Sequence, residues 1–172
     1  MIGVKRHQVL LAPHDDHWEN EYQSARDEFR AIMGDNIVEV HHVGSTAIKG
    51  IVAKPIMDIA VVIKSEDLLN IAGMEAAGYE YCGDAGVPGR YFFVRRVNGD
   101  ISTHHIHCYL KDNDNYNSVI LFCKFLNDNP GYAKQYNDLK LELARKYPDD
   151  RKAYGAAKTA FIEEIVTIAR NE

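Results

Sequence analysis

The sequence lacks an excess of basic residues. Its 20 Lys and Arg are outnumbered by 25 Asp and Glu, which gives a net charge of −5 and an isoelectric point near 5.9. Domains that bind nucleic acid usually carry a basic face that neutralises phosphates. The charge balance therefore argues against nucleic acid as the partner.

Cysteine is also scarce, and long apolar runs are missing. The three cysteines, Cys82, Cys108 and Cys123, are odd in number and fit no metal-binding spacing, so we expect reduced thiols in a cytoplasmic protein. No secretory signal is visible at the N-terminus, and no stretch reaches membrane-spanning length. Repeats and low-complexity tracts are absent too. The 172 residues suit one domain covering positions 1–172.

Apolar periodicity predicts the elements of the first half. The first dozen residues suggest an edge strand or an extended arm. A helix is expected where apolar residues recur at steps of three and four between Trp18 and Met33, with Asp16 as its cap and Gly34 as its end. Strands are expected at 36–43, 56–63 and 79–81. Ser65 suits the cap of a second full helix that ends at Gly78.

The second half contains a clear hairpin signal. Residues 91–97 and 101–110 flank Asn98-Gly99, a pair typical of tight turns. A glycine-rich loop covers 82–90, where a plain surface connection and a substrate-covering loop are both open readings. A polar loop is expected at 112–117, followed by three helices around 119–126, 132–147 and 150–169. Strands mixed with helices in this order predict an α+β fold, a mixed β-sheet with a helical layer and C-terminal helices.

One acid stands out in an otherwise apolar strand. Asp58 lies within Ile56–Ile63, shortly after the Gly44-Ser45 turn. Burying a carboxylate is costly unless a partner compensates it. A structural pairing, for instance with Lys54, is one reading. The other is a metal-holding acid beside a turn whose backbone N–H groups hold phosphate oxygens.

Around these residues the sequence resembles the GrpB family of the nucleotidyltransferase-like superfamily. The resemblance rests on His42-Val43-Gly44-Ser45-Thr46-Ala47, on Lys54-Pro55-Ile56-Met57-Asp58-Ile59, on Thr103-His104-His105-Ile106-His107, and on Tyr154, Lys158 and Phe161. It implies a nucleotidyltransferase-like fold. The family brings no settled reaction with it.

The resemblance also implies a metal site with a gap in it. Nucleotidyltransferases usually place two acids at alternate positions of one strand and a third on a neighbouring strand. Asp58 fills the first position, Ala60 stands at the second, and the third falls on the strand of His105 and His107. Two imidazoles and one carboxylate could bind a divalent metal, although such sets favour transition metals over Mg²⁺. Either histidine could instead serve as a general base, or both could be half-buried strand residues.

Basic residues that could bind phosphate are scattered along the chain. They are Lys54, Arg90, Lys140 and Lys158, in addition to the Gly44-Ser45 turn. A two-residue hairpin turn places Arg90 opposite His107, whereas a three-residue turn places Tyr91 there. Lys140 and Lys158 lie one helical turn after Tyr136 and Tyr154, although lysines beside an apolar stripe usually extend to water.

The family pattern differs at one further place. An Arg followed by an acid is expected where Cys123 and Lys124 stand. Cys123 is therefore read as a small buried apolar residue rather than a nucleophile.

Two functions follow as expectations. The first is metal-dependent transfer of a nucleotidyl group to an unknown acceptor, with Asp58, His105 and His107 as catalytic and metal-binding residues and Mg²⁺ or Mn²⁺, alternatively Zn²⁺, as cofactor. The second is a non-catalytic module that binds a nucleotide or a phosphorylated small molecule with a degenerate metal site. Ala60 favours this second function. A third possibility is hydrolysis, because Asp58, His105 and His107 could also activate water. The sequence does not specify an oligomeric state.

Overall fold

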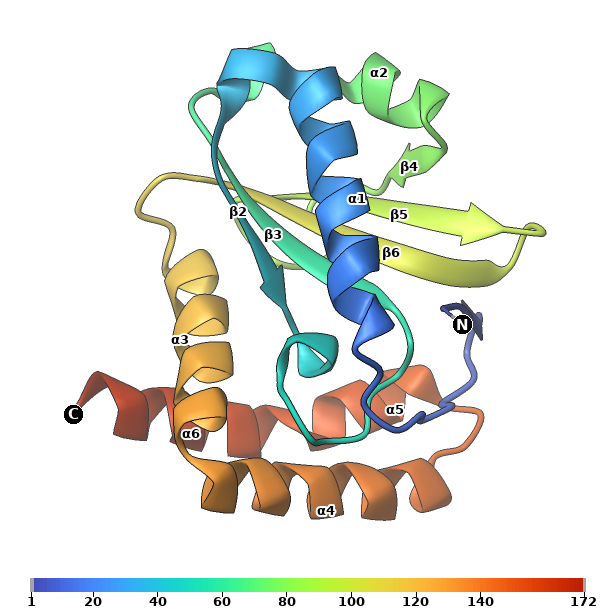
Figure 1. The fold of residues 1–172 in the computed structure, drawn as a ribbon, viewed down its shortest axis with the longest axis vertical. Helices are drawn as coiled ribbons and strands as arrows, with labels where there is room; N and C mark the ends of the chain where they lie inside the picture. The colour runs from blue at the N-terminus through green and yellow to red at the C-terminus, as the bar shows by residue number, and fades with distance from the viewer. Residues whose placement is uncertain (1, 172) are drawn as a thin grey trace.

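The computed structural model describes residues 2–171, which form one mixed β-sheet with helices on both faces (Figure 1). The strands are β1 (Val4–Lys5), β2 (Ile37–Val43), β3 (Met57–Ile63), β4 (Tyr79–Tyr81), β5 (Arg90–Val97) and β6 (Ile101–Leu110). Their order is β2-β3-β6-β5-β4, with β1 also paired to β6. Among the described strands, β3 and β6 run parallel to each other, and the other pairs are antiparallel. The predicted α+β fold with a mixed sheet is confirmed.

Within the described residues, six α-helices pack around this sheet. They are α1 (His17–Met33), α2 (Ile71–Ala76), α3 (Asp114–Asp128), α4 (Pro130–Lys146), α5 (Arg151–Ala157) and α6 (Thr159–Arg170). Three short 3-10 turns cover Gly34–Asn36, Ser45–Ala47 and Glu66–Leu68. Within residues 2–171, none of the helices combines the length and the apolar character that a membrane crossing requires.

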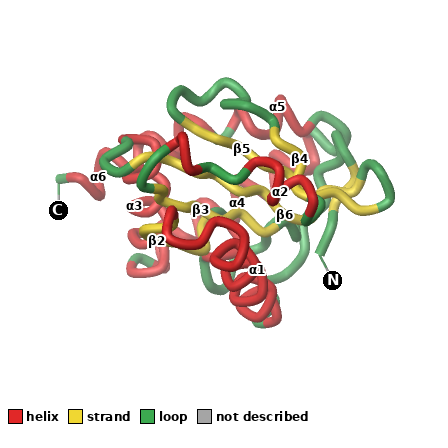
Figure 2. Tube along the Cα trace, turned by 90° about the horizontal axis from the view of Figure 1, so that it is seen from above, coloured by secondary structure: helices red, strands yellow, loops and turns green. Residues whose placement is uncertain are grey.

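The alternation of side chains along β3 divides the interior into two cores. Met57, Ile59, Val61 and Ile63 face one cluster, which contains the apolar stripe of α1. Ala60 and Val62 face a second cluster, formed with α3, α4 and α6. The two helical layers lie on opposite sides of the strands, as Figure 2 shows for α1 and α5. Because successive strand residues point to opposite faces, Asp58 shares the face of the C-terminal helices.

Helix α1 forms as predicted, but its cap differs. Trp18, Tyr22 and Phe29 are buried along one stripe, and Gly34 ends the helix at a φ of 52°. Asp16 has a helical backbone and its side chain makes no capping hydrogen bond. The carboxylate of Asp15 accepts instead from the N–H of His17 at 3.0 Å. Asp16 thus occupies the predicted cap position, but the predicted capping hydrogen bond from its side chain does not form.

The segment after β3 is broken rather than one full helix. Ser65 caps only the turn Glu66–Leu68, accepting from the N–H of Asp67. The helix α2 starts later, where the side chain of Asn70 accepts from Gly73. Leu68 is 60% exposed, so a continuous helix would gain little burial from it. The predicted cap is correct and the predicted length is wrong.

The β5–β6 hairpin has a register that neither predicted turn produces. Val97 pairs with Ile101 across a three-residue connection, and a bulge between Arg95 and Arg96 adds one more step. Phe92 therefore stands opposite His107, while Arg90 stands opposite Tyr109. The expectation of Arg90 or Tyr91 at that place was wrong, because a bulge inserts one unpaired residue into one strand.

The chain after β6 is more helical than predicted. Helix α3 begins at Asp114, inside the expected loop, because Asn113 accepts from the N–H groups of Asn115 and Tyr116 and caps it. The last predicted helix divides into α5 and α6 at Lys158. Gly155 lies just before this break, where its low helix propensity weakens the last turn of α5.

Candidate functional site

The turn after β2 brings the backbone against Asp58. Gly44 has a φ of 70°, and a Cβ at this position would lie 2.8 Å from Oδ2 of Asp58 and 2.9 Å from its Cβ. A side chain larger than hydrogen is therefore excluded twice, by backbone conformation and by contact. The turn continues into Ser45–Ala47, and the amide N–H of Ala47 donates to the carbonyl of Gly44 at 3.1 Å.

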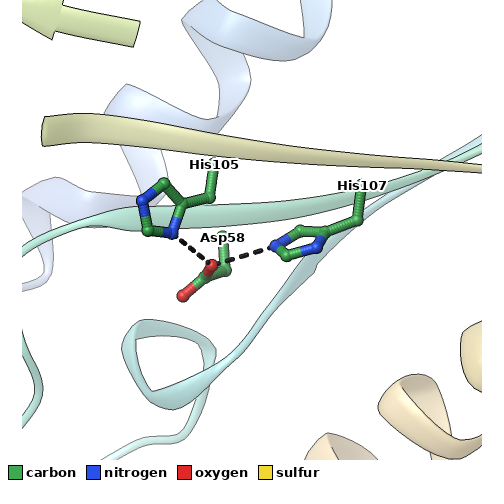
Figure 3. Close-up of side chains that lie close together, drawn as sticks. All are labelled: Asp58, His105 and His107. Carbon is green, nitrogen blue, oxygen red and sulfur yellow. Dashed lines mark hydrogen bonds and ion pairs between the residues drawn. The ribbon is translucent and has the colours of Figure 1, made fainter. Parts of the chain in front are cut away.

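Two histidines of β6 converge on the carboxylate of Asp58 (Figure 3). Nδ1 of His105 lies 3.3 Å from Oδ1 of Asp58, and Nε2 of His107 lies 3.1 Å from the same oxygen. Parallel pairing aligns Asp58 with His105 and Ala60 with His107. The three side chains share one face, and one ligand atom from each lies within 4.8 Å of the others. The structure thus brings together the three residues singled out from the sequence.

The histidines stabilise the ionised form of Asp58. Burial opposes ionisation, yet the contacts of His105 and His107 outweigh it and hold the pKa of Asp58 well below its usual range. Burial also lowers the pKa of His107, against the opposing effect of Asp58. A pairing of Asp58 with Lys54 does not occur among the described residues; its partners are the two imidazoles.

Arg90 reaches the cluster from the neighbouring strand. Its Nη1 lies 3.2 Å from Nδ1 of His107, although the backbones of the two residues are not opposite each other. The same guanidinium lies over the ring of Phe92, 4.4 Å from its centroid. It also donates to the carbonyls of Asp84 and Ala85 in the glycine-rich loop, at 3.0 and 3.2 Å. Arg90 therefore joins this loop to the cluster.

A cavity of about 290 Å³, here called the Asp58 cavity, opens beside the cluster. The sheet and the Gly44 turn form one wall, and the C-terminal helices form the other. Its lining residues are Gly44, Ser45, Lys54, Ile56, Asp58, His105, Ser118, Val119, Phe122, Cys123, Tyr136, Tyr154, Lys158 and Ile162. Its size is at the lower end of the range of small-molecule sites.

Two lysines enter this cavity without an acidic partner. The amines of Lys54 and Lys158 lie 5.4 and 4.5 Å from the centroid of the Tyr154 ring. Neither forms an ion pair within residues 2–171. Burial lowers the pKa of Lys54 to about 7 and that of Lys158 to about 8, and the charge of Lys158 adds to the effect on Lys54. An anion bound between them would restore their charge.

Lys140 does not line the Asp58 cavity. It is 1% exposed, its amine donates to the carbonyl of Val52, and it lies 4.8 Å from the centroid of the Tyr136 ring. Burial lowers its pKa to about 7. The alternative of a water-exposed lysine is wrong for this position, because the amine donates to a backbone carbonyl inside the protein. The phosphate contact stays a prediction, and it would have to form outside the Asp58 cavity.

The helical wall contains residues that no sequence pattern marks as part of a site. Phe122, Val119 and Ile162 supply its apolar part, and Tyr136 lines the cavity together with Ser45. The spacing of Tyr136 and Tyr154 to their lysines was visible in the sequence, but apolar residues of helices carry no signal that separates a cavity wall from a core. Cys123 is buried, its thiol pKa is raised by burial to about 12, and its Sγ faces the carbonyl of Gly44 at 3.8 Å. The reading of Cys123 as a small buried residue is confirmed.

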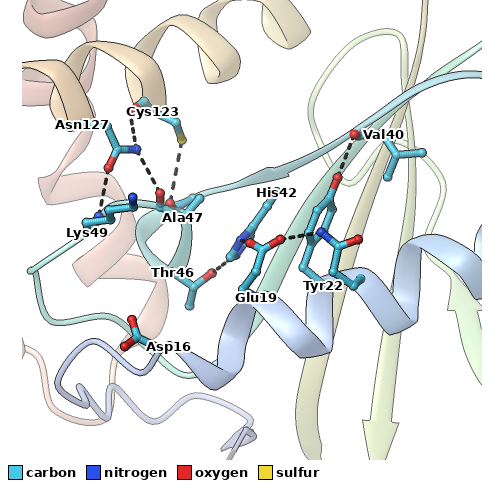
Figure 4. A network of polar contacts seen from close by, with 12 residues as sticks. Asp16, Glu19, Tyr22, Val40, His42, Thr46, Ala47, Lys49, Cys123 and Asn127 are labelled. Atoms are coloured by element: carbon cyan, nitrogen blue, oxygen red, sulfur yellow. Dashed lines mark hydrogen bonds and ion pairs between the residues drawn. The ribbon is translucent and has the colours of Figure 1, made fainter.

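A second set of contacts fixes the Gly44 turn from its other side (Figure 4). Nε2 of His42 lies 2.8 Å from the hydroxyl of Thr46, and the His42 ring stacks on Tyr22. From α3, Asn127 donates to the carbonyl of Ala47 and accepts from the N–H of Lys49, each at 3.0 Å. The turn is thus held between α1 and α3.

The ligand atoms of the cluster decide which metal fits. Two imidazole nitrogens and one carboxylate suit Mn²⁺, Fe²⁺ or Zn²⁺ better than Mg²⁺, which favours oxygen ligands in octahedral geometry. Ala60 is fully buried and supplies no ligand. The residues present therefore fit one transition-metal ion and do not fit a pair of Mg²⁺ ions.

Sequence and structure comparisons agree on one family. Residues 8–167 match the GrpB protein family. The glutamate-rich protein GrpB of Alkalihalophilus pseudofirmus is 33% identical over 171 residues, covering 96% of this chain and 98% of that protein. The crystal structure of the conserved protein GrpB from Enterococcus faecalis superposes with a TM-score of 0.85 at 31% identity, covering 94% and 98% of the two chains.

A more distant similarity identifies the fold. Cid1 poly(U) polymerase, in a crystal structure bound to MgATP, matches with a TM-score of 0.52 at 15% identity. The match covers 84% of this chain and 50% of that one. The predicted nucleotidyltransferase-like fold is confirmed. With its family match over almost the whole length and two GrpB relatives above 30% identity, the chain belongs to the GrpB family.

Proposed function

We propose that this protein binds a nucleotide in the Asp58 cavity and, with a divalent metal, transfers its nucleotidyl group to a small-molecule or protein acceptor. The observation that carries the proposal is the lysine pair. Two cations without an acidic partner enter a cavity that also contains a carboxylate–histidine cluster. Phosphate groups are the anions that such an arrangement suits, because they accept charge-assisted hydrogen bonds from several directions.

The parts of the cavity suit different parts of a nucleotide. Lys54 and Lys158 would hold phosphate oxygens, and the backbone N–H groups of the Gly44-Ser45 turn would add to them. Asp58, His105 and His107 would hold the metal, which neutralises phosphate charge and polarises the α-phosphate. Phe122 and Tyr136 offer aromatic surface for a base. Cid1 structures with MgATP and with a UTP analogue provide examples of the fold with nucleotides bound.

The transfer itself would be an in-line displacement. The acceptor hydroxyl attacks the α-phosphorus, a new P–O bond forms, and the bond to the β-phosphate breaks with release of pyrophosphate. His105 lines the cavity, whereas His107 does not. Where Asp58 and His107 hold the metal without it, His105 is the better placed of the two histidines to accept the proton of the attacking hydroxyl. The three free thiols support a reducing, cytoplasmic setting for this reaction.

Binding of nucleoside triphosphates in the presence of Mn²⁺ tests the proposal. Titration calorimetry with ATP, CTP, GTP and UTP is expected to show at least one that binds. Lys54→Met and Lys158→Met should each weaken it by about tenfold or more, since a hydrogen bond to a charged group contributes about 1.5–3 kcal/mol. Lys152→Met is the matched control, because Lys152 is exposed on α5 and lies outside the cavity. Absence of binding by all four nucleotides contradicts the proposal.

A non-catalytic module is the second candidate, favoured by Ala60. Ala60 lies two residues from Asp58 on the same face and is fully buried, so the strand supplies one acid where two-metal transfer uses two. The two candidates differ in turnover. Nucleotide binding with no release of pyrophosphate, across Mg²⁺, Mn²⁺ and Zn²⁺ and a pool of small-molecule hydroxyl acceptors, favours the module.

A further inference from the structure

The hydrogen bonds around His107 define its tautomer. The guanidinium of Arg90 has five N–H donors and no acceptor. Its Nη1 faces Nδ1 of His107 at 3.2 Å, so Nδ1 must carry the lone pair. A neutral imidazole then has its proton on Nε2, which points to Oδ1 of Asp58 at 3.1 Å. The chain Arg90–His107–Asp58 is therefore fully matched, donor to acceptor, at each step.

This arrangement is opposite to that of a histidine prepared for a metal. A ligating imidazole usually donates its second N–H to a carboxylate or a carbonyl. Here the nitrogen nearest Asp58 carries the proton, and the far nitrogen faces a cation. To ligate an ion through Nε2, His107 must move its proton to Nδ1. That proton would then point at the N–H groups of Arg90.

Arg90 also fixes the glycine-rich loop. Its Nε and Nη2 donate to the carbonyls of Asp84 and Ala85. Ala85 has a φ of 46°, a backbone conformation that residues with a side chain rarely adopt. Gly83, Gly86 and Gly89 have positive φ angles as well. The backbone is thus strained at Ala85, whose carbonyl accepts from the same guanidinium that contacts His107.

We propose that Arg90 is a positioning residue that competes with a transition-metal ion for His107, so that metal binding releases Arg90 from His107 and shifts the loop at 83–89. The inference rests on the metal-binding part of the proposed function. Arg90 and the metal cannot contact His107 at the same time. Arg90 needs the lone pair on Nδ1, whereas the metal needs the lone pair on Nε2. A neutral imidazole carries its proton on one of these two nitrogens, so each tautomer suits one of the two partners. Metal loading and loop conformation are coupled through this one side chain.

The tautomer of His107 provides a test that needs no variant. In ¹⁵N NMR spectra of the metal-free protein, His107 is expected as the Nε2–H tautomer. Addition of Zn²⁺ should convert it to Nδ1–H. Hydrogen exchange at the amides of Val87 and Arg90, which donate to the carbonyls of Asp84 and Val87, should become faster with Zn²⁺. An Nδ1–H tautomer in the metal-free protein overturns the proposal.

Zn²⁺ titration of variants tests the competition itself. Arg90→Met removes the donors, so its affinity for Zn²⁺ should rise by about 10–100-fold, the range over which outer contacts tune metal sites. Arg96→Met is the matched control, since Arg96 lies on the same strand and pairs with Glu80 away from the cluster. The Zn²⁺ affinity of Arg96→Met should equal that of the unmodified protein.

The outcomes separate this proposal from the proposed function. Equal affinity of Arg90→Met and the unmodified protein overturns the competition and leaves the metal site standing. No Zn²⁺ binding by any of the three proteins overturns the competition and the metal role together. Titration with ATP in the absence of metal then still reports on the phosphate part of the cavity.

Discussion

At the scale of single residues, Gly44 is the position where the site tolerates least change. Gly44→Ala should destabilise the protein by about 2–5 kcal/mol, because a positive φ costs about 1–2 kcal/mol and the contact with Asp58 adds overpacking of about 1–3 kcal/mol. Gly50→Ala is the control, since Gly50 has a φ of 74° and no atom within 4 Å of an added Cβ. Urea unfolding of both variants gives the difference due to Asp58. Equal destabilisation would show that the contact contributes nothing.

Asp58 is the residue whose charge matters more than its shape. In Asp58→Asn the amide oxygen still accepts from the N–H of His107, so the free energy of unfolding should change by only about 1 kcal/mol. Zn²⁺ affinity should fall at least about tenfold, because the negative ligand is lost. Calorimetric titration and urea unfolding of the same samples measure both. Unchanged Zn²⁺ affinity would exclude Asp58 from the metal site.

At the scale of elements, the segment just before β3 and the α5–α6 junction place Lys54 and Lys158 in one cavity, and their lowered pKa values predict a pH dependence. Anion binding needs both amines protonated, so ATP affinity without metal should decrease as pH rises through about 7 and about 8. Calorimetry at pH 6.5, 8 and 9.5 should show a loss of about tenfold or more. Proton uptake on binding near pH 8 is the independent check. A pH-independent affinity would mean that neither lysine contacts the anion.

The free protein should respond to pH with the opposite sign. The unfolded chain, with ordinary lysines near pKa 10.4, binds more protons than the folded one between pH 7 and 10. These two lysines therefore contribute stability that increases as pH rises across that window. Ligand affinity and stability of the free protein should thus move in opposite directions.

Local sequence patterns predicted most helices and strands. The features that they did not predict, such as the register of the β5–β6 hairpin and the burial of Lys140, depend on the rest of the fold. Alternation along β6 was sufficient to expect His105 and His107 on one face, because a strand has a fixed period of two. The expectation of Asp58 beside them came from the resemblance to the nucleotidyltransferase-like superfamily. The bulge at Arg95 and Arg96 has no signature in residue type, and it moved Arg90 away from the expected partner. The burial of Lys140 depends on Val52, which is 88 residues distant. No local pattern contains that information.

At the scale of the whole molecule, ligand binding should stabilise sheet and helical layer together. A ligand at about a hundred times its dissociation constant adds about 2.7 kcal/mol to the free energy of unfolding. For a domain of this size that corresponds to a rise of about 5–10 °C in the melting temperature. Thermal scans with each nucleoside triphosphate and Mn²⁺ measure it, and Lys158→Met should lose most of the rise. An equal rise in that variant would place the nucleotide elsewhere.

The origin of the cavity walls has a consequence for biosynthesis. One wall comes from the Gly44 turn and β3, whereas the other ends with Lys158, between the last two helices, and with Ile162 on α6. Chains are made from the N-terminus at about 5–20 residues per second, and domains generally fold as units. The strands and α1 are therefore synthesised seconds before the second wall exists. Only complete chains would therefore bind the nucleotide. A chain that ends before α6 would contain the strands of the sheet but would not bind the ligand.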